Sequence, residues 1–142
     1  MLRGISPLLS PDILKAICEM GHGDELVLAD GNFPGYALGR RVISCAGHRV
    51  THLLQALLPL FPLDALAPAQ AVLMEVTPGD LQEDPPVWSE YKEVLEKFEP
   101  KAKVDAIARQ SFYERSSRAY LILQTGETAL YGNLILRKGV VI

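Results

Sequence analysis

Residues 10–30 have the sequence SPDILKAICEMGHGDELVLAD, in which the signals for a helix, a tight turn and a buried strand follow one another. The Ser-Pro-Asp triplet at 10–12 is typical of a helix start: a hydroxyl cap, proline at the first helical position, and a carboxylate at the positive end of the helix dipole. Apolar residues then recur at helical spacing until Gly21, a natural stop. The apolar run within residues 25–30 predicts a buried strand that ends on a carboxylate.

The rest of the chain repeats this alternation of helix and strand patterns. Further strands are expected at 42–45, 71–76, 104–108, 119–124 and 134–136, and helices at 50–60, 87–98 and 111–117. Ser111 and Glu114 have the spacing of a capping box for the last helix, whereas residues 31–36 are expected to form a loop. The pattern predicts an α/β fold: a single layered domain over residues 1–142, with a central sheet flanked by helices.

Composition excludes several classes of protein. The 142 residues are 49% hydrophobic and 22% charged, as in ordinary globular domains, which excludes a disordered chain and a small disulfide scaffold. The net charge of −3 gives no electrostatic basis for binding nucleic acid or an anionic membrane. No apolar run approaches the roughly 20 residues that span a bilayer, and the N-terminus does not resemble a secretion signal. Cys18 and Cys45 are therefore expected to be buried free thiols in the cytoplasm.

Two residues beside the first strand are candidates for chemistry. His22 lies between two glycines, where the backbone can approach a ligand and the ring can face a cavity; an imidazole exchanges protons near neutral pH. Its alternative role is to cap the preceding helix. Asp30 ends the strand, in position to accept hydrogen bonds from sugar hydroxyls or to orient His22; its alternative role is to cap a turn. Asp24 fits a turn better than a site.

Two further segments offer groups that bind hydroxyls. Arg109 follows a predicted strand, and its several N–H donors suit vicinal hydroxyls, although a surface salt bridge would account for it equally. The Tyr131-Gly132-Asn133 segment precedes the last strand, where a tyrosine can stack on a sugar and an asparagine can bind its hydroxyls. A glycine-containing turn would explain the same residues without a ligand.

A metal site is not predicted. His48 and His52 have the i, i+4 spacing of zinc ligands, but they lack the glutamate of a His-Glu-x-x-His motif and an obvious third ligand. The sequence also contains neither a glycine-rich phosphate loop nor a Gly-x-Ser-x-Gly motif. The residues themselves indicate an α/β domain with a site for a small polar ligand.

The ordered set of motifs resembles the RbsD/FucU sugar mutarotase family, over essentially the whole chain. The segments that carry the resemblance are Leu2–Pro11, Glu19–Glu25, Asp30 with Asn32–Pro34, Phe112–Arg115, Thr125–Glu127, Tyr131–Asn133 and Lys138–Val140. The Tyr-Gly-Asn form at 131–133 and the Phe-Tyr-Glu-Arg segment resemble the L-fucose mutarotase branch, whereas ribose pyranases more often have Tyr-Ala-Asn. Gly31, Tyr36 and Ala37 depart from the fucose branch.

The resemblance implies a reaction, a set of site residues and an assembly. The implied reaction interconverts the α- and β-anomers of L-fucose without a cofactor, with His22 as proton donor. Substrate contacts are implied for Asp30, Arg109 and the segment 131–133. The implied assembly is a homo-oligomer, a decamer of two pentameric rings, with sites close to subunit contacts.

Three alternatives stay open at this point: a D-ribose pyranase, a noncatalytic monosaccharide-binding protein, and a metal-dependent enzyme that uses His48 and His52. Apolar and aromatic residues in loops and short elements also favour an oligomer, because exposed apolar patches often mark interfaces. Phe33, Tyr36, Phe112 and Tyr113 are expected to be of this kind.

Overall fold

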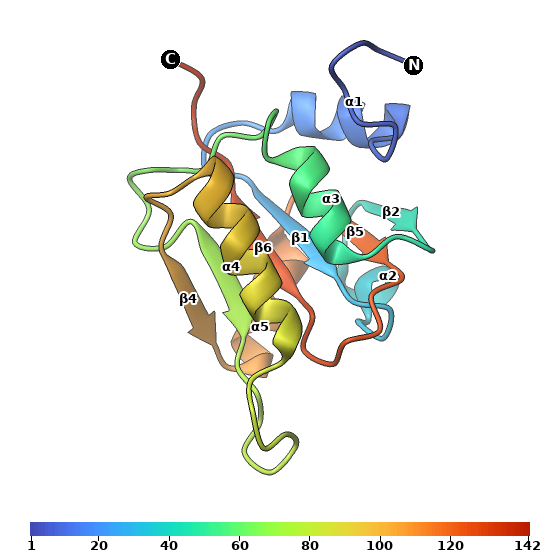
Figure 1. Cartoon of the computed structure of the whole chain (residues 1–142). Coiled ribbons are helices and arrows are strands. Elements are labelled where there is room, and N and C mark those ends of the chain that lie inside the picture. Colours follow the sequence, from blue (N-terminus) through green and yellow to red (C-terminus); the bar gives the residue numbers. More distant parts are fainter.

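A computed structural model describes residues 1–142 and contains one six-stranded sheet with the strand order β2-β5-β1-β6-β3-β4 (Figure 1). The strands are β1 (Glu25–Ala29), β2 (Val42–Cys45), β3 (Ala71–Met74), β4 (Val104–Ile107), β5 (Leu121–Thr125) and β6 (Leu134–Arg137). The helices are α1 (Pro11–Glu19), α2 (Gly35–Leu38), α3 (Val50–Leu57), α4 (Pro86–Phe98) and α5 (Arg109–Arg118). This arrangement confirms the predicted α/β fold with a central sheet.

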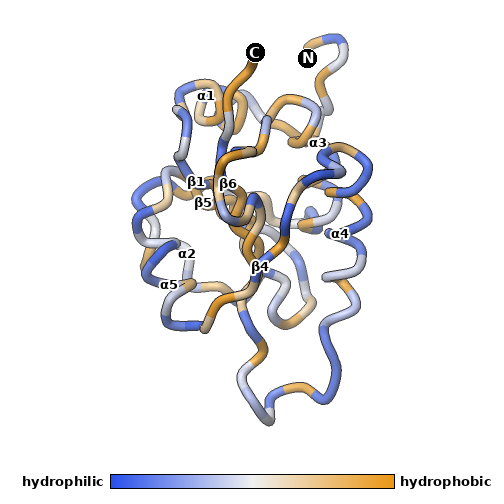
Figure 2. The backbone as a smooth tube through the Cα atoms, turned by 90° about the vertical axis from the view of Figure 1, so that its left-hand side faces the viewer, coloured by the Kyte–Doolittle hydropathy of each residue, from blue (hydrophilic) through white to orange (hydrophobic).

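The elements form three layers. Helices α3 and α4 lie side by side over one face of the sheet, and α2 and α5 cover the other, as the side view of the backbone shows (Figure 2). Helix α1 lies at one end of the sheet, beside both chain termini. Because helices cover both faces, the central strands are mostly apolar, and every residue of β3 is buried.

The direction of the strands defines two edges of the sheet. Strands β1, β2 and β5 run parallel to one another, as do β3 and β4, while β6 lies antiparallel between β1 and β3. One edge, here called the carboxyl edge, therefore carries the ends of β1, β3 and β5 and the start of β6. The opposite, amino edge carries the starts of β1, β3 and β5 and the end of β6. Ligands of open α/β sheets bind at the carboxyl edge.

A single hydrophobic core of 36 buried residues joins the layers. Leu26, Val27 and Leu28 of β1 have no exposed surface, and Tyr91 and Phe61 are among the largest fully buried side chains. A core of this size stabilises a chain of 142 residues without disulfides, and both cysteines are free. None of the helices has the length and apolar character needed to cross a membrane.

Two helix predictions were wrong in detail. The loop expected at residues 31–36 is cut short, because Gly35 and Tyr36 begin the one-turn helix α2, in which Gly39 N–H donates to the Gly35 carbonyl. Its stability comes from tertiary packing: Gly35 is buried against Gln124 and Ile122 of β5. Helix α5 begins at Arg109, so Ser111 lies inside it and caps nothing. The capping-box spacing was misleading because Ala108 already has the extended backbone of an N-cap residue.

The burial of several side chains also corrects the sequence analysis. Cys18 is exposed, because Ile13 and Ile17 define the buried face of α1 and Cys18 lies off it, whereas Cys45 is buried as expected. Burial raises the pKa of the Cys45 thiol to about 11. Phe33 and Phe112, expected at an exposed interface, are buried and pack edge to face with ring centroids 5.9 Å apart. Among the four aromatic residues of that expectation, Tyr36 is exposed.

The two predicted helix caps give a matched test of the structure. Ser10 Oγ accepts a hydrogen bond from the Ile13 N–H at 3.3 Å, whereas Ser111 makes no such bond. We expect Ser10→Ala to lower the free energy of unfolding by about 1 kcal/mol, and Ser111→Ala to leave it unchanged or slightly raised. Urea denaturation followed by circular dichroism measures both. Equal losses in the two variants would contradict the assigned helix starts.

Candidate active site

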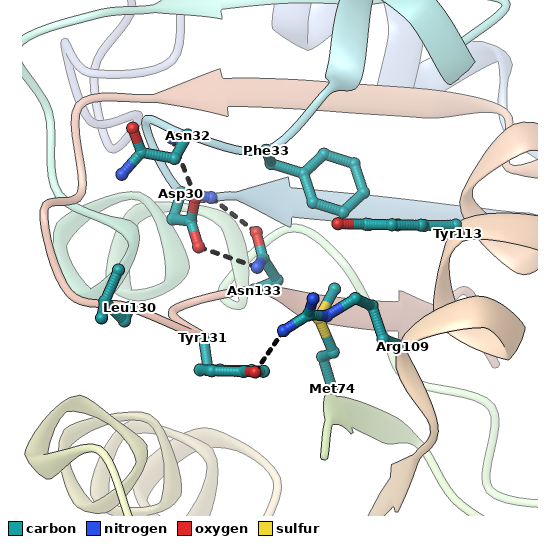
Figure 3. Close-up of a pocket in the computed structure, with 9 residues that line it drawn as sticks. All are labelled: Asp30, Asn32, Phe33, Met74, Arg109, Tyr113, Leu130, Tyr131 and Asn133. Carbon is teal, nitrogen blue, oxygen red and sulfur yellow. Dashed lines mark hydrogen bonds between the residues drawn. The ribbon is translucent and has the colours of Figure 1, made fainter. Parts of the chain in front are cut away.

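A pocket of about 230 Å³ opens at the carboxyl edge of the sheet (Figure 3). Its walls come from the ends of β1 and β3, the start of α5 and the turn before β6, four segments far apart in the sequence. The lining residues are Asp30, Asn32, Phe33, Met74, Arg109, Tyr113, Leu130, Tyr131 and Asn133. Four of the six predicted site residues therefore line one pocket: Asp30, Arg109, Tyr131 and Asn133.

Asp30 and Asn133 form a reciprocal pair at the bottom of this pocket. The Asp30 backbone N–H donates to Asn133 Oδ1, and Asn133 Nδ2 donates to Asp30 Oδ2, both at 2.8 Å. The Asp30 side chain also accepts from the Asn32 N–H at 2.9 Å, so the predicted alternative, a turn cap, holds at the same time. Burial raises the pKa of Asp30, while the hydrogen bonds from Asn32 and Asn133 oppose that rise. The pocket thus contains a fixed, buried carboxyl group, which suits the binding of hydroxyl donors.

Tyr131 is held in a strained conformation. Its φ of 57° makes it the only non-glycine residue with a left-handed backbone, which is costly for a bulky side chain and common at functional sites. Two side chains of α4 fix the turn: Trp88 Nε1 donates to the Tyr131 carbonyl at 2.9 Å, and the Tyr91 hydroxyl donates to the Gly132 carbonyl at 2.8 Å. Gly132 itself does not line the pocket. A side chain there would collide with Ala129 O, 2.9 Å from the position of a Cβ.

Arg109 and Tyr131 meet across the mouth of the pocket (Figure 3). Arg109 Nη2 donates to the Tyr131 hydroxyl, which in turn donates to Asp80 of the loop between β3 and α4. Arg109 also pairs directly with Asp80 at 2.9 Å, so the predicted alternative of a surface salt bridge is present as well. The Tyr131 hydroxyl also accepts a hydrogen bond from the Thr77 N–H at 3.2 Å. With one donated and two accepted hydrogen bonds, this hydroxyl has no capacity left for another partner. Tyr131 can therefore offer a ligand its ring face but no free hydroxyl.

Aromatic and aliphatic groups complete the lining of the pocket (Figure 3). The Phe33 and Tyr113 rings are 5.6 Å apart at an interplanar angle of 67°, and Met74 and Leu130 complete the apolar surface. A pocket in which a few polar groups lie among apolar ones fits a small molecule with both hydroxyls and C–H surface.

His22 lies at the amino edge, away from the pocket. It precedes β1 while Asp30 follows β1, and a five-residue strand of about 17 Å separates them. The His22 side chain is half exposed, and its Nε2 lies 3.2 Å from Asp64 Oδ1. No contact with the end of α1 supports the alternative role of a helix cap; Met20 provides that cap. Asp24 fulfils the expected turn role, since its Oδ2 accepts from the Gly21 N–H at 2.7 Å.

A chain of charges supports the buried Asp64. Arg137 Nε donates to Asp64 Oδ2 at 3.0 Å, and the hydrogen bond from His22, together with Arg137, lowers the pKa of Asp64. Asp64 therefore stays ionised and holds one nitrogen of the His22 ring, which leaves the other nitrogen open. Gly23 supports this arrangement: its φ of 86° favours glycine, and a Cβ would lie 3.2 Å from Arg137 Nη2.

The predicted pair His48 and His52 does not share a helix. His48 precedes α3, His52 lies within it, and both are exposed. Nowhere in the chain do three or more His, Cys, Asp or Glu side chains group as metal ligands would.

Sequence reasoning missed Asp64 and Asp80. Asp80 belongs to the Pro-Gly-Asp segment 78–80, which is typical of a surface turn, and Asp64 lies in a segment with no motif around it. Both act on residues distant in the sequence, so only the folded chain reveals their partners.

Fold and pocket together define an α/β protein with a partly polar pocket at the carboxyl edge of its sheet. The comparison with protein families gives the particular family: residues 3–141 match the RbsD / FucU transport protein family. The chain belongs to the RbsD/FucU family, as its motifs indicated.

Solved structures of similar proteins agree with this assignment. The chain is 43% identical to the fucose mutarotase of Streptococcus pneumoniae, whose structure contains L-fucose, with a TM-score of 0.94 and coverage of 99% of this chain and 100% of that one. FucU from Bifidobacterium longum is 41% identical, with the same TM-score and coverage. RbsD of Bacillus subtilis, solved with D-ribose, is 18% identical with a TM-score of 0.72 over the full length of both chains, and shows the shared fold.

The hydrogen bond from Tyr91 gives a clean test of the support for the pocket. In Tyr91→Phe the buried Gly132 carbonyl loses its partner, so we expect the free energy of unfolding to fall by about 1–2 kcal/mol. Tyr120→Phe is the matched control, because the Tyr120 hydroxyl bonds to Glu19 at an exposed site and its loss should cost little. Urea denaturation compares the two variants. If Tyr120→Phe lowered the free energy of unfolding as much as Tyr91→Phe, the buried hydrogen bond to Gly132 would contribute no more than an exposed one.

Proposed function

We propose that this protein is a cofactor-independent L-fucose mutarotase, formed by one domain over residues 1–142. The observation that carries the proposal is the pocket itself: a buried Asp30–Asn133 pair faces Arg109 in a chain 43% identical, over nearly its whole length, to a fucose mutarotase solved with L-fucose.

The reaction requires only proton transfers. A proton leaves the anomeric hydroxyl while another reaches the ring oxygen, and the C1–O5 bond breaks to give the open-chain aldehyde. Rotation about the C1–C2 bond presents the other face of the aldehyde. Reclosure reverses both proton transfers and gives the opposite anomer. General acid–base catalysis typically accelerates such steps by about 10²–10⁴-fold.

Asp30, Asn133 and Arg109 hold the sugar. The buried Asp30 carboxylate accepts from hydroxyls, and Asn133 fixes its orientation. Arg109 donates from the N–H groups that Asp80 and Tyr131 leave free. The ring of Tyr131 packs against the sugar, while Gly132 allows the tight turn that presents it.

His22 is the proton donor in this proposal, and it reaches the pocket of a neighbouring copy. One strand length separates His22 from the pocket of its own chain, so a shared site requires the amino edge of one subunit to meet the carboxyl edge of the next. The buried carboxylate of Asp64 orients the imidazole.

Exposed apolar side chains at both edges support this contact. Met1, Leu2, Val141 and Ile142 are exposed beside the amino edge, where both chain termini lie, and Leu130 is exposed at the pocket. Such surfaces favour a homo-oligomer, in our proposal the decamer of two pentameric rings. Two free thiols in the chain fit a cytoplasmic enzyme.

Saturation-transfer NMR measures the exchange between the α- and β-anomers of L-fucose directly. We expect the wild-type protein to accelerate exchange and His22→Ala to slow the catalysed rate by about 10²–10⁴-fold, the usual contribution of a general acid. His52→Ala is the control, since His52 lies exposed on α3 and should leave the rate unchanged.

The same assay separates the alternatives. Acceleration of pyranose–furanose exchange for D-ribose, without acceleration for L-fucose, would identify a ribose pyranase. Sugar binding in a calorimeter without any acceleration of exchange would identify a noncatalytic binding protein. Neither binding nor exchange with common monosaccharides would refute the proposed function.

Mixing two inactive variants tests the shared site. His22→Ala and Asp30→Asn damage opposite edges of the chain, so a mixed oligomer contains some sites with an intact histidine from one subunit and an intact aspartate from the next. We expect each pure variant to be inactive and the co-refolded mixture to regain part of the wild-type exchange rate. Failure to regain activity, with mixed oligomers confirmed by mass spectrometry, would place both residues in one chain's site.

A further inference from the structure

Arg109 is the only cationic side chain that lines the pocket, and it is already paired. Its Nη2 lies 2.9 Å from Asp80 Oδ2, and the same nitrogen donates to the Tyr131 hydroxyl. Asp80 belongs to the loop that connects β3 to α4 and projects beyond the carboxyl edge of the sheet (Figure 1). Asp80 does not itself line the pocket, so it acts on a ligand through Arg109 and Tyr131.

Asp80 is a stable negative charge at this position. The hydrogen bond from Tyr131, followed by the bond and charge of Arg109, lowers the pKa of Asp80. The charge of the Arg109 guanidinium is therefore balanced by the Asp80 carboxylate. The pocket lining itself contains one further carboxylic acid, Asp30. In and beside the pocket there are thus two carboxylic acids, Asp30 and Asp80, and one cation, Arg109. That cation is already paired with Asp80.

This balance favours ligands without charge. An uncharged sugar needs hydrogen-bond donors, and the Nε and Nη1 groups of Arg109 have no partner within the chain. An anionic sugar needs an unpaired cation to offset the loss of its hydration, and here it would also face the charges of Asp80 and Asp30. The same arginine without Asp80 would attract an anion, as arginines at phosphate and carboxylate sites do.

We propose that Asp80 is a specificity-determining residue: it neutralises Arg109 so that the pocket accepts free, uncharged sugars and rejects sugar acids and sugar phosphates. This inference rests on the proposed function and adds the class of substrate that the site excludes.

The test compares two ligands of nearly equal size, L-galactose and L-galacturonate, which differ in a hydroxymethyl against a carboxylate group. Isothermal calorimetry gives the affinity of the wild-type protein for both and for L-fucose. We expect the wild-type protein to bind L-galacturonate at least about tenfold more weakly than L-galactose. The Asp80→Asn substitution removes the charge but keeps an oxygen that can accept from Tyr131. We therefore expect the ratio of the affinity for L-galactose to the affinity for L-galacturonate to shrink about tenfold.

Two further variants make the result specific. Asp84→Asn removes a charge from the same loop at an exposed position without an ion-pair partner and should leave the ratio at the wild-type value. Asp80→Glu keeps the charge and should preserve the discrimination, which a merely structural role of Asp80 would not predict.

The outcomes separate the two proposals. An unchanged ratio in Asp80→Asn, or wild-type protein that binds L-galacturonate as tightly as L-galactose, would overturn the role of Asp80 while L-fucose binding and exchange leave the mutarotase proposal intact. Wild-type protein that binds no sugar would overturn both.

Discussion

The paired hydrogen bonds between Asp30 and Asn133 connect the fold to the site. They join the end of β1 to the start of β6, the antiparallel strand inserted between two parallel groups. With β6 in this position, the turn that contains Tyr131 meets the start of α5 at the carboxyl edge. A polar pair buried this deeply is costly unless both members are fully bonded, so its geometry leaves little freedom. The pocket is therefore a consequence of how β6 enters the sheet.

Much of this architecture could be predicted from the sequence. The apolar runs of β1 and β2 and the cap at Ser10 are local signals, and the structure confirms them. Errors arose where tertiary contacts outweigh local preference: α2 forms because Gly35 packs on β5, and α5 begins at Arg109 although Ser111 has the spacing of a cap. Phe33 and Phe112 lie in short elements yet reach the core, which no local pattern indicates.

The site residues also divide into those that the local sequence indicates and those that only tertiary contacts reveal. Asp30, Arg109, Tyr131 and Asn133 stood out by residue type and by position near strand ends, and the fold brings them together. The ion-pair partners of Asp64 and Asp80 are all more than twenty residues away, so nothing in the neighbouring sequence distinguished these two aspartates. His22 differs again: the chain places it at the amino edge, and the role that we propose for it in catalysis depends on a surface that a second molecule supplies.

The left-handed backbone of Tyr131 sets a limit on how this protein can evolve. Glycine at position 131 would relieve the conformational strain, but it would remove a ring buried in the core and the phenol that gathers Arg109, Asp80 and Thr77. The packing and hydrogen bonds of the tyrosine outweigh the strain of its backbone, so the residue can be exchanged neither for glycine nor for a smaller side chain without a loss of stability. Greater robustness would have to come from other positions, such as the surface of α1 or the turns far from the ligand.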